Sequence, residues 1–266
     1  MLAGVYSANK KNGELYYRAS ITFRGKHVSL GSYPSECKAH EAYLFANELL
    51  QEDVKWKLED YPSPCILSFH KWVVLMNFRD NKIYFKNPIY LKKTFFLYYI
   101  DNLTVLKFNA EDLFYYANHK IMRRGGHLFV SDYGMQLSVL ARYGIKNYAV
   151  LGRDYRLING DAHDLRYHNI EVINQYHGVI RTYRKNQPVF RAKIHINGDY
   201  LIGIYTSEEE AAIAYNKAAL LLKNRGLKKI FPQNFIDGMD EITYAKVFQK
   251  IALSKRFRNY AERLQT

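Results

Sequence analysis

The stretch RAKIHINGDYLIGIYTSEEEAAIAYNKAALLL, residues 191–222, contains the pattern that decides the fold. From Phe190 to Ile196 polar and apolar residues alternate, which predicts a strand with one buried face. A turn with Gly198 and a short third strand follow, and alanines then recur at helical spacing from Ala211 onward. The stretch therefore predicts a small antiparallel sheet that is covered on one face by a helix.

The same pattern occurs near the start of the chain, from Gly4 to Leu50, and again from Gly178, with an offset that drifts only from 174 to 172 residues. The aligned identities are Gly4 with Gly178, Val5 with Val179, Arg18 with Arg191, Ala19 with Ala192, Gly25 with Gly198, Gly31 with Gly203, Glu36 with Glu208, Ala39 with Ala211, Ala42 with Ala214 and Tyr43 with Tyr215. Chance does not explain so many aligned identities, so we expect two copies of one module.

Alternation within each copy predicts which side chains point away from the helix. In the first copy these are Arg18, Ser20, Thr22 and Arg24. In the second copy they are Arg191, Lys193, His195 and Asn197, and Arg181 and Arg184 from the preceding hairpin are expected to join them. A sheet lined with such residues suits the major groove of DNA, where Arg reads guanine and Lys or Arg neutralises phosphate. The alternative is that these residues only solvate the open face of an antiparallel sheet.

Both copies resemble the Apetala-type DNA-binding domain of plant ethylene-response factors. The resemblance rests on the opening Gly-Val, on RASI at Arg18 and RAKI at Arg191, on GSY at Gly31 and GIY at Gly203, and on the helix AAIAYNKAA from Ala211. It implies that the sheet, and not the helix, reads the groove. The family's outward aromatic residue is replaced by Ser29 and by Leu201, so the family's own target sequence does not carry over to this chain.

Composition agrees with a polyanionic partner. The 266 residues carry a net charge of +14, and residues 178–230 alone contain ten basic and four acidic residues, a net charge of +6. No apolar run reaches the roughly 18 residues of a membrane span, which predicts a cytoplasmic, nucleoid-associated protein and no membrane partner. The two cysteines, Cys37 and Cys65, are expected to be reduced packing residues.

The middle of the chain is predicted to form separate modules. Residues 61–64 are expected to be a linker, and residues 65–118 an aromatic-rich region with a hairpin around Asp101 and a helix from Glu111. A strand near 127–134, a helix near 135–144 and a second helix that begins at Asn169 are expected after that.

Residues 119–177 resemble a degenerate HNH nuclease, because Asn159-Gly160-Asp161, Asp164, Arg166 and Asn169-Ile170-Glu171 follow that family's spacing. The resemblance implies a metal ligand at position 156 and a histidine base at position 157, and these positions hold Arg156 and Leu157. Leucine cannot take a proton, and an arginine cannot bind a cation. The sequence thus predicts that catalysis is lost and that Arg156 and Arg166 hold phosphate.

Two alternatives for this region remain open. In the first, His163 or His168 serves as the base, Asp161 and Asn169 bind Mg²⁺ or Mn²⁺, and the protein nicks DNA. In the second, Asn159-Gly160-Asp161 is only a turn and Asn169 only a helix cap.

Taken together, the sequence predicts an α+β protein of several modules. The expected modules are an Apetala-type module over 1–57, the aromatic-rich region over 65–118, the ββα-type HNH-like module over 119–177, a second Apetala-type module over 178–230 and a C-terminal helical segment over 231–266. We expect a regulator of transcription from a bacterium, phage or mobile element that binds double-stranded DNA sequence-specifically, without a cofactor or a small-molecule substrate. The competing functions are an active HNH homing endonuclease and an architectural or recombination accessory protein.

Overall fold

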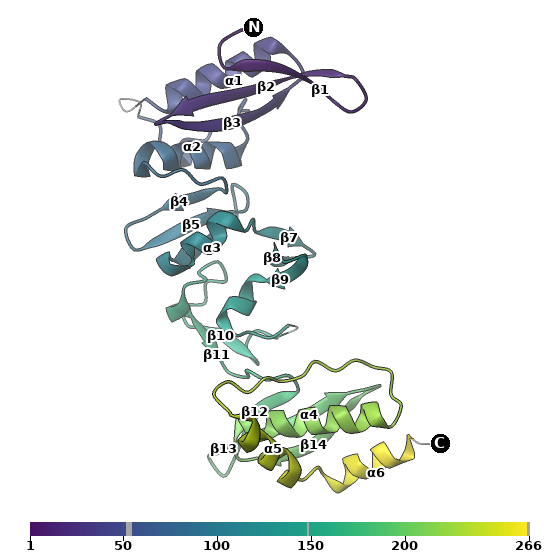
Figure 1. Cartoon of the computed structure of the whole chain (residues 1–266). Helices are drawn as coiled ribbons and strands as arrows, with labels where there is room; N and C mark the ends of the chain where they lie inside the picture. Colours follow the sequence, from purple (N-terminus) through teal and green to yellow (C-terminus); the bar gives the residue numbers. More distant parts are fainter. Residues whose placement is uncertain (52–54, 148, 265–266) are drawn as a thin grey trace. The chain divides into compact units, whose positions relative to one another are not determined.

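The computed structural model describes residues 1–51, 55–147 and 149–264, and it has an α+β fold (Figure 1). The expected fold class is confirmed at this level, because several small antiparallel three-stranded sheets pack against helices. The chain divides into two compact units, Met1–Val139 with Asp161–Asn169, and Leu140–Gly160 with Ile170–Thr266. Each unit is described by itself, and residues 265–266 of the predicted C-terminal segment lie outside the described range.

The first unit opens with the first predicted copy. Its elements are β1 (Val5–Asn9), β2 (Leu15–Phe23), β3 (Lys26–Tyr33) and α1 (Glu36–Leu49). The strands pair in the order β1-β2-β3, and Ser35 caps α1 by accepting a hydrogen bond from the Lys38 N–H. Ala39, Ala42 and Ala46 are fully buried, because their small side chains let α1 lie close to the sheet.

The predicted linker at residues 61–64 is not a boundary between cores. Helix α2 (Phe69–Asn81) contributes Trp72, Val73 and Met76 to the same core as α1. The Trp72 indole N–H donates to the Leu58 carbonyl at 2.9 Å, and the Tyr61 hydroxyl donates to the Leu67 carbonyl at 2.9 Å. The prolines therefore turn the chain within one core instead of separating two modules.

The rest of the first unit consists of two further sheets and a short helix. The elements are β4 (Ile89–Leu91), β5 (Phe95–Tyr99), β6 (Val105–Asn109), α3 (Leu113–Asn118), β7 (Met122–Arg124), β8 (His127–Asp132) and β9 (Met135–Ser138). The predicted hairpin around Asp101 and the helix after Glu111 are confirmed. The prediction of a helix over 135–144 is wrong in its first half, where the chain forms β9 and pairs with β8. In its second half the chain forms a 3₁₀ helix over Val139–Tyr143.

The second unit contains the second predicted copy. Its elements are β10 (Tyr155–Leu157), β11 (Ile170–Val172), β12 (Val179–Arg184), β13 (Gln187–His195), β14 (Asp199–Tyr205), α4 (Glu208–Asn224), α5 (Glu241–Lys250) and α6 (Lys255–Arg263). The strands β12-β13-β14 form a sheet that α4 covers on one face (Figure 1).

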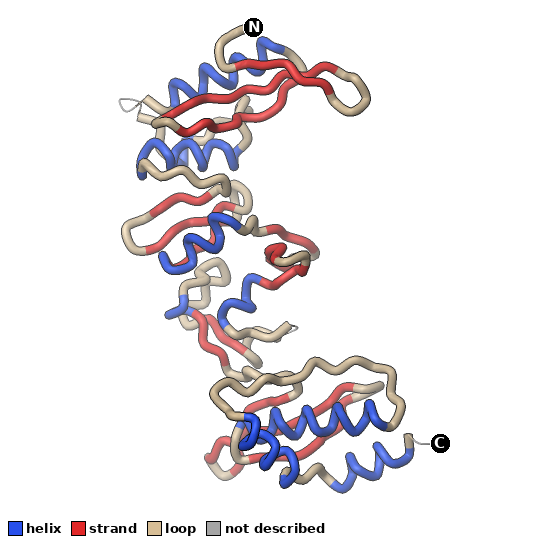
Figure 2. Tube along the Cα trace, viewed as in Figure 1, coloured by secondary structure: helices blue, strands red, loops and turns tan. Residues whose placement is uncertain are grey.

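The chain beyond α4 packs on this second module. A long loop leads from the end of α4 back across the module to α5 (Figure 2). Ile236 of this loop and Leu253, Phe257 and Ala261 around α6 belong to the core that α4 forms with the sheet. The C-terminal helical segment thus completes the second module. None of the helices in the described part of the chain is long and apolar enough to cross a membrane.

Candidate nucleic-acid interface

The two modules share a backbone irregularity that positions their outward side chains. The pairing of the central strand with the third strand shifts between Ala19 and Ser20, and it shifts at the equivalent place between Ala192 and Lys193. The additional residue on the third strand is Leu30 in one module and Ile202 in the other, and both are buried. Such a bulge increases the local twist of a sheet and redirects side chains, so the two modules present their outward residues in the same geometry.

A tyrosine anchors each module to the segment that follows its helix. The Tyr33 hydroxyl donates to the Ile66 carbonyl at 3.2 Å, and the Tyr205 hydroxyl donates to the Ala252 carbonyl at 2.8 Å. Burial raises the pKa of Tyr33, and burial raises the pKa of Tyr205 to about 12, so both hydroxyls keep their donor proton at neutral pH. The Gly-x-Tyr step is therefore a structural element of the repeat.

The face of the second sheet that α4 does not cover is called here the second open face. Cross-strand partners share a face. The residues that the strand pairing places on the second open face include Ile180, Thr182, Arg184, Arg191, Lys193, His195, Leu201 and Ile204. The alternating strand β13 is confirmed, because Phe190, Ala192 and Ile194 are buried under α4.

Arg191 lies at the middle of the second open face. It is directly opposite Ile180 of β12 and opposite Ile204 of β14. Its Nε atom is buried and has no hydrogen-bond partner among the described residues. An unpartnered buried donor is costly, and the guanidinium would have to turn outward for a ligand acceptor to reach it.

The other predicted residues of this copy are distributed over both faces. His195 is exposed, with its Nδ1 at 2.8 Å from Oδ1 of Asp199, and Lys193 lies opposite Leu201. Arg184 ends β12 on the second open face. Arg181 does not belong to the same face: it pairs with the buried Phe190, and its guanidinium lies 5.7 Å from the centre of that ring. The prediction for Arg181 is corrected, because one residue along a strand reverses the face.

The first module has a corresponding first open face, which is rich in hydroxyl groups. The pairing assigns to it Tyr6, Tyr16, Arg18, Ser20, Thr22, His27, Ser29 and Ser32. Arg18 is the equivalent of Arg191, and its Nη2 and Nε donate to the Tyr16 hydroxyl at 2.7 and 3.1 Å. These hydrogen bonds, together with one to Tyr6, raise the pKa of Arg18. Arg18 is thus a fixed cation among neutral hydroxyl groups.

Two predicted residues of the first module are placed differently from the expectation. Ser20 is only 8% exposed, and its N–H donates to the Gly4 carbonyl at 2.9 Å, which extends the pairing of β1 with β2. Arg24 lies in the turn between β2 and β3, with a positive φ of 46°, and its guanidinium is 5.6 Å from the centre of the Phe23 ring. Arg18 and Thr22 are exposed on the first open face as predicted.

Both arginines predicted to hold phosphate are ion-paired. In the second unit, Nε and Nη2 of Arg156 each lie 2.7 Å from Oε2 of Glu171, which is its partner across the β10–β11 hairpin. In the first unit, Arg166 donates from Nε and Nη2 to both oxygens of Asp164, at 2.8 and 2.6 Å. A phosphate would have to compete with a carboxylate at either position.

Asn169 does not begin a helix, which corrects the expected ββα order. It ends a 3₁₀ turn over Tyr167–Asn169, and β11 follows directly. The side chain is fully buried, and its amide donates to the carbonyls of Asp161 and Asp164, at 3.1 and 2.7 Å. Asn169 therefore closes the loop that precedes it.

The remaining nuclease candidates are spread along the same loop. An oxygen of Asp161 is 3.0 Å from the Lys107 ammonium, and the main chain of His163 accepts from the Lys107 N–H at 2.9 Å. These hydrogen bonds attach the loop to β6 in the manner of an added strand. His168 is exposed. In the described residues, no group of three or more His, Cys, Asp or Glu side chains could hold a metal ion.

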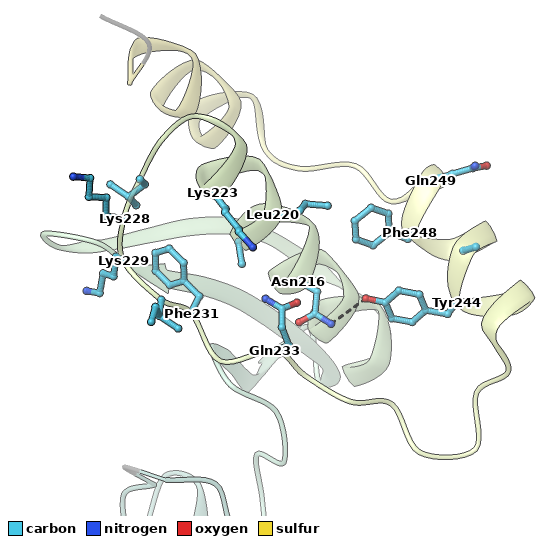
Figure 3. A pocket seen from close by; sticks show the side chains of 14 residues that line it. Asn216, Leu220, Lys223, Lys228, Lys229, Phe231, Gln233, Tyr244, Phe248 and Gln249 are labelled. Carbon is cyan, nitrogen blue, oxygen red and sulfur yellow. Dashed lines mark hydrogen bonds between the residues drawn. The ribbon is translucent and has the colours of Figure 1, made fainter.

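An apolar groove of about 780 Å³ lies on the helix side of the second module (Figure 3). The Asn216 amide of α4 donates to the Tyr244 hydroxyl of α5 at 3.0 Å across one end, and Phe231 and Phe248 line opposite walls. Its lining includes Leu220 and Phe248 but no carboxylate. The groove opens between α4, α5 and the loop that joins them, away from the second open face.

Sequence reasoning missed the aliphatic residues next to Arg191 and the tyrosine that holds Arg18. Ile180 and Ile204 come from neighbouring strands, and only the register of the sheet brings them beside Arg191. The signal for Tyr16 was present, because Tyr16 and Arg18 are two residues apart and must share a face of one strand.

Comparisons with known proteins found no match: no family model matches the chain, and no curated protein or solved structure is significantly similar to it.

Proposed function

We propose that this protein binds double-stranded DNA sequence-specifically through the open faces of its two repeated sheets. The observation that carries the proposal is Arg191, a guanidinium at the centre of the second open face whose Nε has no partner among the described residues. Guanine offers two acceptors, O6 and N7, to such a group in the major groove. The resemblance of both copies to Apetala-type domains supports the same interpretation.

The size of the sheet fits the groove. Neighbouring strands lie about 4.8 Å apart, so the outer strands of a three-stranded sheet are roughly 10 Å apart. The major groove is about 12 Å wide. Each module has three antiparallel strands and a helix on one face only, so its other face is accessible to the bases.

The two open faces differ in chemistry, which favours an asymmetric target. Around Arg191 the neighbours are Ile180 and Ile204, and aliphatic side chains contact the methyl group of thymine. Around Arg18 the neighbours are Tyr6 and Ser32, whose hydroxyl groups form hydrogen bonds with several base edges. We therefore propose two unlike half-sites, joined in one recognition site by one chain.

We propose further that binding occurs without cleavage, as expected of a transcription regulator. Three observations support this view. Leu157 occupies the position at which the nuclease resemblance implies a histidine base, Lys107 pairs with Asp161, and the Asn169 amide closes a loop.

The test is selection of bound fragments from sheared genomic DNA in the presence of Mg²⁺ or Mn²⁺, with sequencing of the fragments and their ends. We expect intact fragments that share one motif, and we expect Arg191→Ala to bind that motif about 1 to 3 kcal/mol more weakly while it binds random DNA equally well. Arg181→Ala, which changes a cation on the other face, is the matched control. Fragment ends that accumulate inside the motif would show that the protein cleaves, and the absence of any enriched motif would refute sequence-specific binding.

A further inference from the structure

Helix α6 has two chemically different sides. Phe257 and Ala261 are buried in the core of the second module. The nine residues of α6 also include four basic side chains and one acidic side chain, Glu262. The basic residues are Lys255, Arg256, Arg258 and Arg263.

Ser254 fixes α6 on the edge of the second sheet. Its N–H donates to the Ile202 carbonyl at 2.7 Å, and its hydroxyl donates to the Leu201 carbonyl at 3.0 Å. The same hydroxyl accepts a hydrogen bond from the Phe257 N–H at 3.2 Å and so caps the helix. Strand β14 is the outer strand of the sheet, so the first turn of α6 lies just beyond that edge (Figure 1).

Tyrosine stacking fixes the rest of the helix. The rings of Tyr200 in β14 and Tyr260 in α6 are 4.0 Å apart between their centres. Together they line a shallow hollow of about 500 Å³ whose remaining walls are polar or basic. Those walls are formed by Lys255, Arg256, Asn259 and Arg263. Among the described residues that line this hollow there are three basic side chains and no carboxylate, which suits a negatively charged ligand.

Tyr200 pairs with the buried Ile194, so the hollow lies on the helix side of the β14 edge, and a DNA backbone would have to reach it past that edge. A sheet that fills the major groove has a phosphate strand along each of its outer edges, because the groove is only slightly wider than three strands. The groove is also about 8.5 Å deep, so its phosphate walls rise past the level of the sheet toward the elements behind it. An element just beyond β14 would therefore face phosphates.

We propose that α6 is a phosphate-binding element that flanks the second open face and grips the DNA backbone along β14. The inference rests on the proposed DNA binding. Lys255 and Arg256 contact phosphate oxygens from the first turn, and Asn259 adds an uncharged donor one turn later. The element contributes affinity that is independent of base sequence, whereas Arg191 contributes specificity.

The experiment measures the affinity of the full chain for its selected site and for random DNA at several salt concentrations. Each phosphate contact contributes about 0.9 to the slope of log K against log salt. We expect the double variant Lys255→Ala with Arg256→Ala to lower that slope by about 1 to 2 on both DNAs and to leave the ratio of the two affinities unchanged. Arg256→Lys keeps the charge and should retain the wild-type slope.

Arg258→Ala is the matched control, because Arg258 belongs to the same helix but lines a different hollow, toward α4. It should change the slope much less than the double variant. An unchanged slope in the double variant, or an equal change in the Arg258 variant, would overturn the proposal for α6 while DNA binding stands. Wild-type protein that binds no DNA would instead overturn the proposed function itself.

Discussion

The ring of Tyr215 in α4 lies directly against Gly178, so close that a Cβ atom on Gly178 would be 2.4 Å from the ring. The first module repeats this contact, with Gly4 against Tyr43 and a separation of 2.0 Å. Both glycines have a positive φ, 70° and 73°. The Gly and Tyr identities that reveal the repeat are therefore two halves of one packing contact.

We expect Gly178→Ala to destabilise the second module by roughly 2 to 4 kcal/mol, because it adds the strain of a positive φ to an overpacked contact. Hydrogen exchange of the α4 amides measures this, and Gly198→Ala, which has free space and no positive φ, should cost little. Gly4→Ala should destabilise the first module for the same reason. Its unfolding can be followed by tryptophan fluorescence, because both tryptophans, Trp56 and Trp72, belong to the core of the first module. Equal exchange in the Gly178 and Gly198 variants would contradict this explanation of the motif.

Ile204 beside Arg191 predicts a contact with a thymine methyl group. Replacement of thymine by uracil next to the guanine of that half-site should weaken binding by about 1 kcal/mol, the value of one buried methyl group. Ile204→Ala should lower affinity for the thymine site and remove the difference between thymine and uracil. Titration of labelled DNA by fluorescence anisotropy gives the four affinities, and a difference that persists in the Ile204 variant would place the methyl contact elsewhere.

Tyr16→Phe tests whether the Tyr16 hydroxyl prepares Arg18 for binding. Loss of the two hydrogen bonds at 2.7 and 3.1 Å frees the guanidinium, so DNA affinity should fall by about 0.5 to 1.5 kcal/mol, less than for Arg18→Ala. Tyr6→Phe removes the other tyrosine hydroxyl that hydrogen-bonds Arg18 and should lower DNA affinity in the same direction. If Tyr16→Phe has no effect in the Arg18→Ala background, the hydroxyl acts through Arg18. Equal losses in both backgrounds would mean that Tyr16 contacts DNA by itself.

Asn169→Ala should reduce stability rather than remove a metal site. The variant leaves two loop carbonyls, those of Asp161 and Asp164, without the amide, and it should cost about 2 to 4 kcal/mol in urea unfolding. Mg²⁺ or Mn²⁺ should shift the melting temperature of wild type and variant equally. A metal-dependent stabilisation that only the wild type has would show that Asn169 is a ligand after all.

Asp154 predicts loss of stability in acid. Burial alone would raise the pKa of this carboxyl, but hydrogen bonds from Arg153 and from the Val150 N–H, with the charge of Lys146, outweigh it and hold the pKa below its usual 3.8. A lowered pKa in the folded state stabilises the protein above the unfolded pKa, and this stability is lost as the pH falls through the folded pKa. Unfolding free energy should therefore decline below about pH 4 to 5. The decline should be shallower in Asp154→Asn, and an equal slope in both proteins would contradict this assignment.

The repeat, the hairpin around Asp101 and the helix after Glu111 were predictable from sequence, whereas the loop over residues 161–169 was not. Alternation around Ala192 and the alanine spacing of α4 are local patterns, and local patterns survive in the fold. The loop over residues 161–169 is held by β6, more than 50 residues earlier in the chain, through Lys107. No local pattern indicates such a contact, so the sequence predicted a helix from Asn169 where a 3₁₀ turn and β11 are found.

Within the candidate interface, the register of the strands determines which side chains share a face, and the sequence alone did not give that register. Arg191 and Lys193 were assigned correctly to one face, because they alternate with buried residues of the same strand. Arg181 was expected beside Arg184 because both precede β13, but two residues three apart on one strand point to opposite faces. Ser20 had the right alternation, but its side chain is buried.

The anchoring tyrosines have a consequence for which helix each module holds. Tyr33 and Tyr205 donate to carbonyls of segments that have nothing else in common, the connection before α2 and the connection before α6. Because a main-chain carbonyl is the same in every residue, the anchor places no demand on the sequence it holds. The same kind of anchor therefore holds a weakly charged helix in one copy and a basic helix in the other, because α2 has two basic and one acidic side chain whereas α6 has four basic and one acidic.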